Sequence, residues 1–585
     1  MPVDLLARGL AARQVRSLAS TAAGKGAALV GTASGLAMQT VLDHSLGVSI
    51  SGVGPGEDAA DAIEAAHARA RLFGVDVLLP PYTVTLSRPV RVNRLRGIPG
   101  FSKIDVSGTT MGIYPLSQFC IVNEHWITTY NRNTADRCSY IGFEILTLPN
   151  KRQSLIGLAN VSFVDVDQVT FRASRNLDGN GRPYAVDALL DFYASVHGGY
   201  VRRSHFHQRT GAYGANRVSA GGGGCIWIRN FSGNGTLPDN VTEQVIIEDC
   251  EFHHYTTDEC IAIFGVRGTT RNCKVLGNRI FGLEAADLGL PLSESIYRPT
   301  LLSIFPLNDG SGPTLGATAA VVGNEFADNQ ISDRSTLYNV IRIGNTADAA
   351  QRNENNATRR NKIDFFFATD ANFGAMAVWT AGGAAGASPA SANIAIRCIE
   401  GTAGVAYSGT LSGNVSQGDE VIVRSGGTIT GGFSGWQSLK GCSTRGSLTS
   451  AALNCQHIEG GRYEASIRGF VNCGLVSSVT IRINLGGSIN AACVIDNVAG
   501  GAFAMTGCQV SGLGPLVYIP STVTGSASVS VTGNIGSVGA QPALNILSPN
   551  ATIRANGNQI SGSNAISAGA GIIKRANNTW GVTDD

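Results

Sequence analysis

The sequence predicts an all-β solenoid, a fold in which short parallel strands stack in coils along one long axis. Two kinds of short strand recur in phase through the middle of the chain, and the composition suits a stack of this kind. The 585 residues include 74 glycines and only 15% charged residues, with a formal net charge of +2. A typical soluble domain has about 7% glycine and about 25% charged residues. A solenoid needs many turns and enlarges its core by adding coils, so a long, glycine-rich chain fits it.

The first kind of strand carries one large apolar residue between polar neighbours. Its copies read VTFRAS, SHFHQR, CEFHHY, NRIFGL and NEFADN, around Phe171, Phe206, Phe252, Ile280 and Phe326. The second kind follows each copy and reads DALLDF, GCIWIR, ECIAIF, TLLSIF and YNVIRI, between Asp187 and Ile343. The alternative fold, a β-sandwich, would show turns about every 8 to 12 residues without this in-phase repeat. The repeat therefore favours coils with loops of variable length.

Composition also excludes several classes of protein. Hydrophobic residues make up 43% of the chain, too many for a disordered protein, and glycine does not recur at every third position as in collagen. We expect no nucleic-acid partner, since binding to phosphates needs a basic stripe. No run of about 20 strongly apolar residues occurs, so we expect no membrane insertion. Arg8, Arg13 and Arg16 interrupt the apolar stretch Met1–Leu18, so we expect no cleaved secretion signal.

The twelve cysteines are scattered without a C-x-x-C pair. We expect free, buried thiols in a reducing cytosol, and neither a disulfide framework, a metal site nor another cofactor. They occupy positions 120, 138, 225, 250, 260, 273, 398, 442, 455, 473, 493 and 508.

The N-terminal part contains two expected helices. Asp4 can cap a weak helix that carries Leu6 and Leu10, a short helical anchor. A second, amphipathic helix begins behind Glu57 and Asp58 and ends at Gly74, before a strand over Val75–Leu79. Its apolar face is formed by Ala59, Ile63, Ala66, Ala70 and Phe73.

Three pieces of this N-terminal part resemble a known family. They are the sequence GAALVG at Gly26–Gly31, the helix start at Asp58–Ala66 and the strand end at Leu78–Tyr82. In this order they are similar to the segment that leads into the right-handed parallel β-helix of bacteriophage tailspikes, which share it with the pectate-lyase superfamily. The resemblance implies a right-handed parallel β-helix and a homotrimer of parallel chains. It also implies attachment to phage tail or baseplate proteins through the N-terminus.

We expect three regions along the chain. Residues 1–45 form the virion-attachment segment, and residues 46–375 contain the amphipathic helix and the receptor-binding or catalytic coils. Residues 376–585 form a Gly/Ser/Thr-rich, β-rich trimerisation region, where only 16 of the 185 residues from Gly401 onward are charged. A surface usually needs charge for solubility, so we expect this region to lie between subunits. The alternative is a charge-poor continuation of a monomeric solenoid.

The outward side chains of the second strand kind predict a binding face, because neighbouring coils stack about 4.8 Å apart. Alignment by inward apolar residues places Leu190, Ile228 and Ile263 in register. The residues that alternation then turns outward are Asp187, Leu189, Asp191, Cys225, Trp227, Arg229, Cys260 and Ala262.

This face suits a sugar polymer. We expect Trp227 to stack on a pyranose ring and Arg229 to pair with an acidic sugar. The candidate acids and bases are four carboxylates. Carboxylates two coils apart should be separated by roughly 9 to 10 Å, and a separation near this value is typical of inverting glycoside hydrolases. These carboxylates are Asp187, Asp191, Asp258 and Glu259.

The segment TTDECIAIFG, Thr256–Gly265, also resembles the D-D-C-I-A-I core of polygalacturonase-type β-helix hydrolases. In that family the paired carboxylates are catalytic. Asp258 matches the first acid and Glu259 replaces the second, whereas the family's downstream G-H-G is absent. The bland alternative is that Asp258 begins a turn and Glu259 is solvated.

Histidines gather on the first strand kind. His253 and His254 are expected to bind substrate, and with Glu251 the group could instead supply the base of a polysaccharide lyase. The alternative is a polar ladder without catalysis, and it includes His205 and His207.

We therefore expect a phage tailspike that recognises and depolymerises a bacterial surface polysaccharide. It would be made in the bacterial cytoplasm and located in the virion. The alternatives are a receptor-binding spike without catalysis and a polysaccharide lyase. A cellular pectinase would need a secretion signal, which Met1–Leu18 does not supply.

Overall fold

The computed structural model describes most of the chain from residue 47 to residue 584, and no side chain between 362 and 432. The segments inside this range that it does not describe are 111–118, 127–135, 150–152, 180–182, 185, 212–222, 231–240, 267, 292–293, 295, 297, 307–318, 334–335, 344–351, 355, 366–375, 381–390, 399–405, 408–410, 413–414, 418–419, 424–427, 430–432, 437, 447, 488, 562–563, 569–571 and 581–582. The expected attachment segment, residues 1–45, lies outside the described residues.

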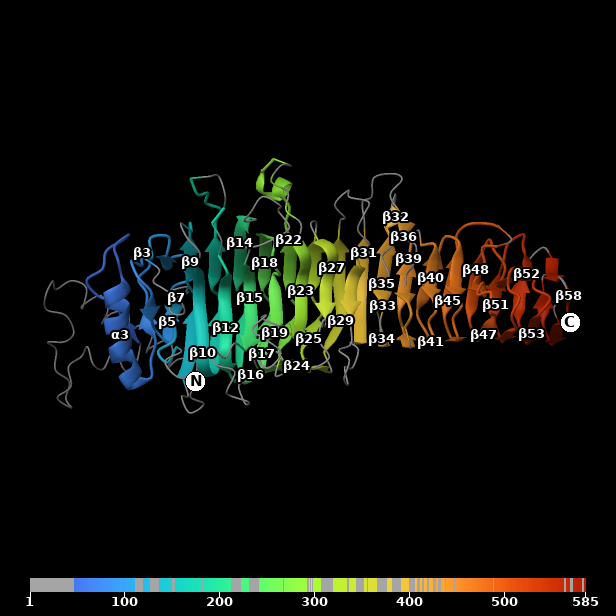
Figure 1. The fold of residues 1–585 in the computed structure, drawn as a ribbon, viewed down its shortest axis with the longest axis horizontal. Coiled ribbons are helices and arrows are strands. Elements are labelled where there is room, and N and C mark those ends of the chain that lie inside the picture. The colour runs from blue at the N-terminus through green and yellow to red at the C-terminus, as the bar shows by residue number, and fades with distance from the viewer. Residues whose placement is uncertain are drawn as a thin grey trace, which may run out of the picture.

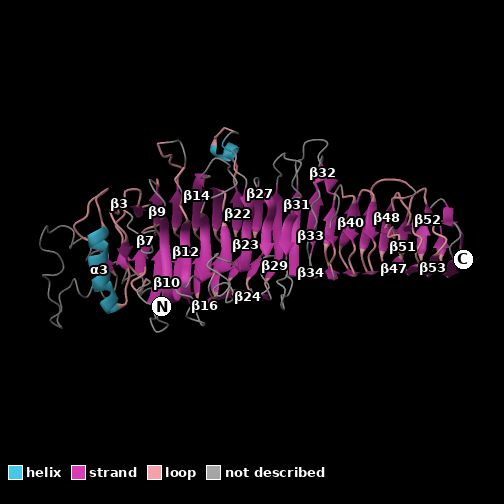
Figure 2. Ribbon diagram, viewed as in Figure 1, coloured by secondary structure: helices cyan, strands magenta, loops and turns pink. Residues whose placement is uncertain are grey.

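The described chain is a parallel β-helix. Coils follow one another along the long axis, from helix α3 (Ala60–Phe73) at one end to β58 (Thr583–Asp584) at the other (Figure 1). Strands make up nearly all of it (Figure 2). Every strand pair among the described residues is parallel, except that between β57 (Thr579–Trp580) and β58. The predicted all-β solenoid is confirmed.

In the middle of the chain each coil contributes strands to three faces. Face 1 consists of β12 (Ala188–Val196), β15 (Gly224–Asn230), β19 (Ile261–Gly265), β23 (Arg298–Pro306) and β27 (Thr336–Ile343). Face 2 consists of β13 (Gly199–Arg202), β17 (Val245–Glu248), β21 (Lys274–Leu276) and β25 (Glu325–Ala327). Face 3 consists of β11 (Thr170–Ala173), β14 (His205–Gly211), β18 (Glu251–Thr256), β22 (Arg279–Gly282) and β26 (Gln330–Asp333).

Helix α3 covers the first coil as predicted. Ile63, Ala66 and Ala70 are buried, while Phe73 is half-buried. The Asp58 carboxylate accepts a hydrogen bond from the Ala60 amide at 3.2 Å, and Gly74 ends the helix in the left-handed conformation at φ 64°. Among the described residues no helix is long and apolar enough to span a membrane.

Identical side chains on neighbouring coils fill the interior. Phe171, Phe206 and Phe252 stack on face 3, with ring centroids 4.6 and 4.7 Å apart. Ile280 and Ile331 continue this ladder. Phe326, which the repeat assigned to the same strand kind, lies instead on β25 of face 2, where it pairs with Val275. Both strands place one large apolar residue inward after a turn, so the sequence pattern does not separate them.

Buried asparagines join the coils at their turns. The Asn278 side-chain amide donates to Asn329 Oδ1 at 3.0 Å, and Asn329 donates to Asn361 Oδ1 at 2.9 Å. Each side chain also donates to a backbone carbonyl, as Asn329 does to Val275 at 2.9 Å. These ladders satisfy turn groups that would otherwise lie unpaired in the interior.

The register on face 1 differs from the predicted alignment by two residues. Leu190 pairs with Ile226, and Phe192 pairs with Ile228, whereas the predicted pairing of Ile228 with Ile263 is confirmed. A shift of two residues keeps every side chain on the same face, so the outward positions within the strands are unchanged. Leu189, Cys225 and Cys260 are exceptions, because they are fully buried in the core rather than outward.

The coils continue into the C-terminal part of the chain. Strands pair across the expected boundary at 375/376, since β27 pairs with β30 (Met376–Thr380) and β29 (Ala357–Phe365) pairs with β31 (Ser391–Cys398). The stack proceeds through β47 (Gly501–Thr506), β50 (Ala527–Thr532), β53 (Ala551–Asn556) and β56 (Ile572–Ala576). One apolar core runs from Val48 to Ile560. All eleven described cysteines are buried and unbridged, so their predicted burial is confirmed.

Candidate functional site

Asp258 and Glu259 lie in the turn between β18 and β19, and each residue as a whole is of intermediate exposure. The turn is fixed by hydrogen bonds from buried neighbours. His254 Nε2 donates to the Asp258 carbonyl at 2.7 Å, and the Asp258 amide donates to Thr256 Oγ1 at 3.3 Å. The Thr256 hydroxyl in turn donates to the Gly223 carbonyl at 2.9 Å. The two carboxyl groups are therefore held on a rigid turn rather than on a free loop.

The surroundings of the Asp258 carboxyl favour its protonated form. Burial raises the pKa of its carboxyl well above the usual range, and the neighbouring carboxyls of Glu259 and Asp187 raise it further. The Glu259 amide donates to Asp258 Oδ1 at 3.0 Å, which offsets only part of this effect. A protonated carboxyl beside an ionisable one is an arrangement typical of general acids.

Asp187 immediately precedes β12 and is 6% exposed. Its charge acts on Asp258, on Asp191 and on Arg229, so it belongs to the same group of charges. Through Asp187, all four predicted carboxylates belong to one group of interacting charges.

The fourth carboxylate, Asp191, has another role. It is fully buried and forms a bidentate ion pair with Arg229, with distances of 3.0 Å to Nε and 2.5 Å to Nη2. Burial raises the pKa of the Asp191 carboxyl even with Arg229 beside it, whereas Asp191 raises the pKa of the guanidinium against the effect of burial. The bidentate contact is that of an ionised pair. Asp191 is therefore not presented as an acid or base, and Arg229 is already paired with a carboxylate of its own chain. Both predicted roles are corrected here.

Aromatic rings enclose the Arg229 guanidinium. Its central carbon lies 4.7 Å from the Tyr193 ring centroid, 4.8 Å from Trp227 and 5.9 Å from Phe264. Trp227 is partly buried rather than fully exposed, and it meets Phe264 edge to face at 6.0 Å. Its indole Nε1 is buried without a hydrogen-bond partner. Trp227 therefore offers a sugar an edge and part of a face, not the open platform that the sequence predicted.

Arg342 belongs to the same face and was not predicted. Asp191, Trp227, Ala262, Ser303 and Arg342 follow one another in register on face 1. Burial lowers the pKa of Arg342, Glu259 opposes this, and its guanidinium lies 5.2 Å from the Phe305 ring centroid. Arg342 occupies the last outward position of YNVIRI, so continuation of the repeat to that strand could have found it.

His253 lies on face 3, not on face 1. Its ring stacks on His207 at 4.8 Å and on Phe281 at 5.0 Å, and it bonds Glu251 at 2.7 Å. Burial, together with the charge of Arg172, lowers the pKa of His207 to about 3. These contacts form a stacked polar ladder, and a base with so low a pKa is poorly matched to proton abstraction.

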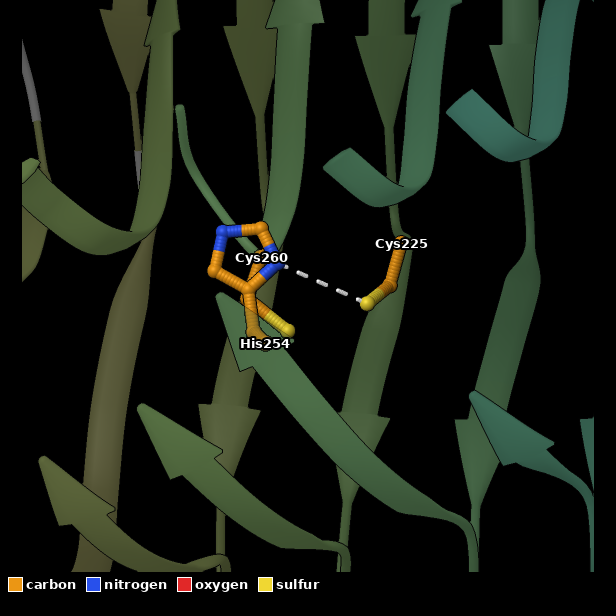
Figure 3. Close-up of side chains that lie close together, drawn as sticks. All are labelled: Cys225, His254 and Cys260. Carbon is orange, nitrogen blue, oxygen red and sulfur yellow. Dashed lines mark hydrogen bonds between the residues drawn. The ribbon is translucent and has the colours of Figure 1, made fainter. Parts of the chain in front are cut away.

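His254 is fully buried in the interior, which corrects the expectation that it meets a polymer at the surface. Cys225 lies near it on the preceding coil, and Cys260 lies near it at the end of the turn that follows β18 (Figure 3). Among the described residues these three side chains form the one group with donor atoms placed to hold a metal ion. No sequence motif indicated this group, because its members come from three separate segments. His254 lies in β18, Cys260 ends the turn after β18, and Cys225 lies in β15.

Comparison with solved structures finds matches of low similarity over most of the chain. The tailspike protein of E. coli bacteriophage HK620 in complex with a pentasaccharide matches 97% of this chain and 86% of its own, at 13% identity and a TM-score of 0.32. PfbA, a surface adhesin of Streptococcus pneumoniae, matches 90% of this chain and 94% of its own, at 11% identity and a TM-score of 0.32.

The catalytic unit of a GH87 α-1,3-glucanase from Streptomyces thermodiastaticus matches 91% of this chain and 68% of its own, at 11% identity and a TM-score of 0.26. No protein-family model and no curated protein matches the chain. Similarities at this level carry no argument about activity, and the parallel β-helix is established here by the strand pairing.

Proposed function

We propose that the chain is a phage tailspike that binds and hydrolyses a bacterial surface polysaccharide on face 1. One observation carries the enzymatic part of this proposal. Asp258, with its raised pKa, lies beside Glu259 on a fixed turn, with Asp187 close enough to influence it. A glycosidase needs one protonated and one ionised carboxyl near the scissile bond.

In the proposed reaction Asp258 donates its proton to the glycosidic oxygen as the bond from that oxygen to the anomeric carbon breaks. Asp187 removes a proton from the water that attacks the anomeric carbon from the opposite side. Glu259 keeps Asp258 protonated before reaction and accepts no part of the sugar. Asp187 precedes β12 and Asp258 precedes β19, two coils apart, so about 10 Å of stacking separates their backbones. This favours inversion, which needs carboxyls about 6.5 to 9.5 Å apart.

Binding would involve Trp227 and Arg342, which share the outward ladder of face 1. An indole edge suits the apolar side of a pyranose, and a guanidinium suits a sugar carboxylate. No cofactor takes part in this reaction.

The proposal includes a homotrimer of right-handed β-helices that is attached to the phage tail by residues 1–45. The exposed large apolar side chains of the C-terminal coils support a subunit interface there, because single chains rarely expose so many in one region. They are Leu475, Leu485, Ile489, Val498, Leu513, Ile535 and Leu547. Size-exclusion chromatography with light scattering tests the subunit number, and three chains per particle is the expected result.

A spike that binds without cleaving is the second candidate, and the Asp191–Arg229 pair favours it. Asp191 and Arg229 bind each other, so neither is available for catalysis or for an ion pair with the sugar. The aromatic side chains around them, such as Trp227, remain. A lyase is less well supported, since His207 has a pKa of about 3 and His253 is bonded to Glu251.

The test uses the full chain with surface polysaccharides purified from candidate host bacteria. We expect new reducing ends without the ultraviolet absorbance of unsaturated uronates. Asp258→Asn should lower the rate by about 10² to 10⁴-fold, the usual contribution of a general acid. Glu248→Gln, which changes a carboxylate on face 2, is the matched control and should keep full activity. Binding of a polysaccharide without any product would instead identify a non-catalytic spike.

A further inference from the structure

Three buried side chains from three neighbouring segments meet inside the β-helix. Cys225 lies in β15, Cys260 immediately precedes β19, and His254 lies in β18. The two sulfur atoms and one imidazole nitrogen all lie within 4.8 Å of one another, and none of the three residues is exposed. Cys225 Sγ is 3.7 Å from His254 Nδ1 (Figure 3).

The hydrogen bonds of His254 fix which ring nitrogen faces the cysteines. Nε2 lies 2.7 Å from the Asp258 carbonyl oxygen, which can only accept, so Nε2 carries the proton. In the neutral ring Nδ1 then has the free electron pair that a metal requires, and it is Nδ1 that faces Cys225. Metal-bound histidines typically donate their other nitrogen to a carbonyl or carboxylate in this way.

The chemistry of the three donors selects the ion. Thiolate and imidazole bind zinc and other soft transition metals, whereas Mg²⁺ and Ca²⁺ prefer oxygen. Two thiolates and a neutral imidazole balance the charge of a divalent cation. This matters in a fully buried position, where a net charge is costly.

Other buried cysteines of the same core show the contrast. Cys250 and Cys273 point at backbone carbonyls, and burial raises the pKa of each thiol to about 12. Neither belongs to a group of three metal-ligating side chains among the described residues. Burial alone therefore does not distinguish Cys225 and Cys260, but the shared histidine nitrogen does.

We propose that Cys225, His254 and Cys260 bind one Zn²⁺ ion inside the β-helix and that this ion fastens the turn carrying Asp258. His254 links the two sites, because one ring nitrogen faces the cysteines and the other holds the Asp258 carbonyl. The zinc site does not depend on the proposed hydrolase activity and would stand if the chain only binds glycan.

The test measures zinc in the full chain, produced with zinc in the medium and purified under reducing conditions. We expect about one zinc per chain by elemental mass spectrometry, the stoichiometry of a single structural site. Cys225→Ser and Cys260→Ser should each lose the metal, and Cys273→Ser, the matched control, should keep it. Substitution with Co²⁺ should give thiolate-to-cobalt charge-transfer absorption in the wild type and the control, and not in a variant that lacks both cysteines.

Hydrogen exchange adds a readout of the fastened turn. Peptides that contain Thr256–Cys260 should exchange faster in Cys225→Ser than in Cys273→Ser. Three results would overturn the proposal: wild-type protein without zinc after incubation with excess metal, zinc retained in both cysteine variants, or a Cys225–Cys260 disulfide in the metal-free protein.

Discussion

Breaking the buried ion pair between Asp191 and Arg229 should open the middle coils far more easily than removing both charges together. Asp191 is fully buried and the Arg229 side chain is 15% exposed, so water cannot replace a lost partner. Asp191→Asn leaves the guanidinium without a carboxylate and removes two charge-assisted hydrogen bonds. The expected cost is about 3 to 5 kcal/mol.

Arg229→Met leaves the carboxylate buried and also removes the contacts with the Tyr193 and Trp227 rings, at 4.7 and 4.8 Å. The expected cost is about 4 to 6 kcal/mol, of which roughly 1 kcal/mol is the cation–π contribution. The double variant Asp191→Asn/Arg229→Met, which combines the two single substitutions, buries no charge and should lie within about 2 kcal/mol of the wild type. These values predict a coupling of at least about 5 kcal/mol between the two residues.

Native-state hydrogen exchange in low urea measures this coupling locally, which suits a stack of coils that need not unfold as one unit. Peptides from β12 and β15 report the opening free energy. The surface pair of Arg271 and Glu243, 2.7 Å apart with Arg271 47% exposed, is the control and should couple by less than about 1 kcal/mol. A coupling energy below about 1 kcal/mol for Asp191 and Arg229 would refute the claim that burial makes this ion pair strong.

Three further predictions concern the ladders and the acid. Phe206→Ala, which opens a gap between two stacked rings, should cost about 3 to 5 kcal/mol in the same exchange assay, and an effect below 1 kcal/mol would contradict the stacking argument. Asn329→Ala removes side-chain bonds to Asn278, Asn361 and a backbone carbonyl and should cost about 3 kcal/mol in the opening free energy, measured by hydrogen exchange of peptides from β22 and β26. The pKa of Asp258 is higher in the folded chain than in the unfolded chain. Protonation of Asp258 therefore stabilises the fold fully at a pH below the unfolded pKa of about 3.9, and this stabilisation is lost as the pH rises through the folded-state pKa. Asp258→Asn should therefore gain stability relative to the wild type with rising pH in thermal melts, and a constant difference would contradict the assignment.

Much of the fold follows from short-range patterns. The amphipathic face at Ile63, Ala66 and Ala70 predicted α3, and the in-phase repeats predicted the stack of coils. Side chains of a strand point to alternate faces with a period of two residues. The predicted outward orientation of Trp227 and Arg229 was therefore right although the predicted register was wrong by two residues. The same property explains why Phe326 was assigned to the wrong strand, since any strand with one inward aromatic satisfies the pattern.

The candidate site was predictable only in part. The motif around Asp258 and Glu259 was recognisable along the chain, but the pairing of Asp191 with Arg229 depends on which coil stacks on which. The enclosure of Arg229 by Tyr193 and Phe264 depends on three different coils in the same way.

The sequence by itself determined that this protein is a solenoid of parallel coils with acidic residues at a turn, because turn residues and apolar alternation act over a few neighbouring positions. Only the tertiary structure decided which charges remain available for chemistry and which lie paired in the interior. It also decided that His254, Cys225 and Cys260 meet in the interior. The physical reason is that burial, pKa and metal-binding geometry depend on contacts between coils some 30 residues apart, and variable loops hide those contacts from any pattern along the chain.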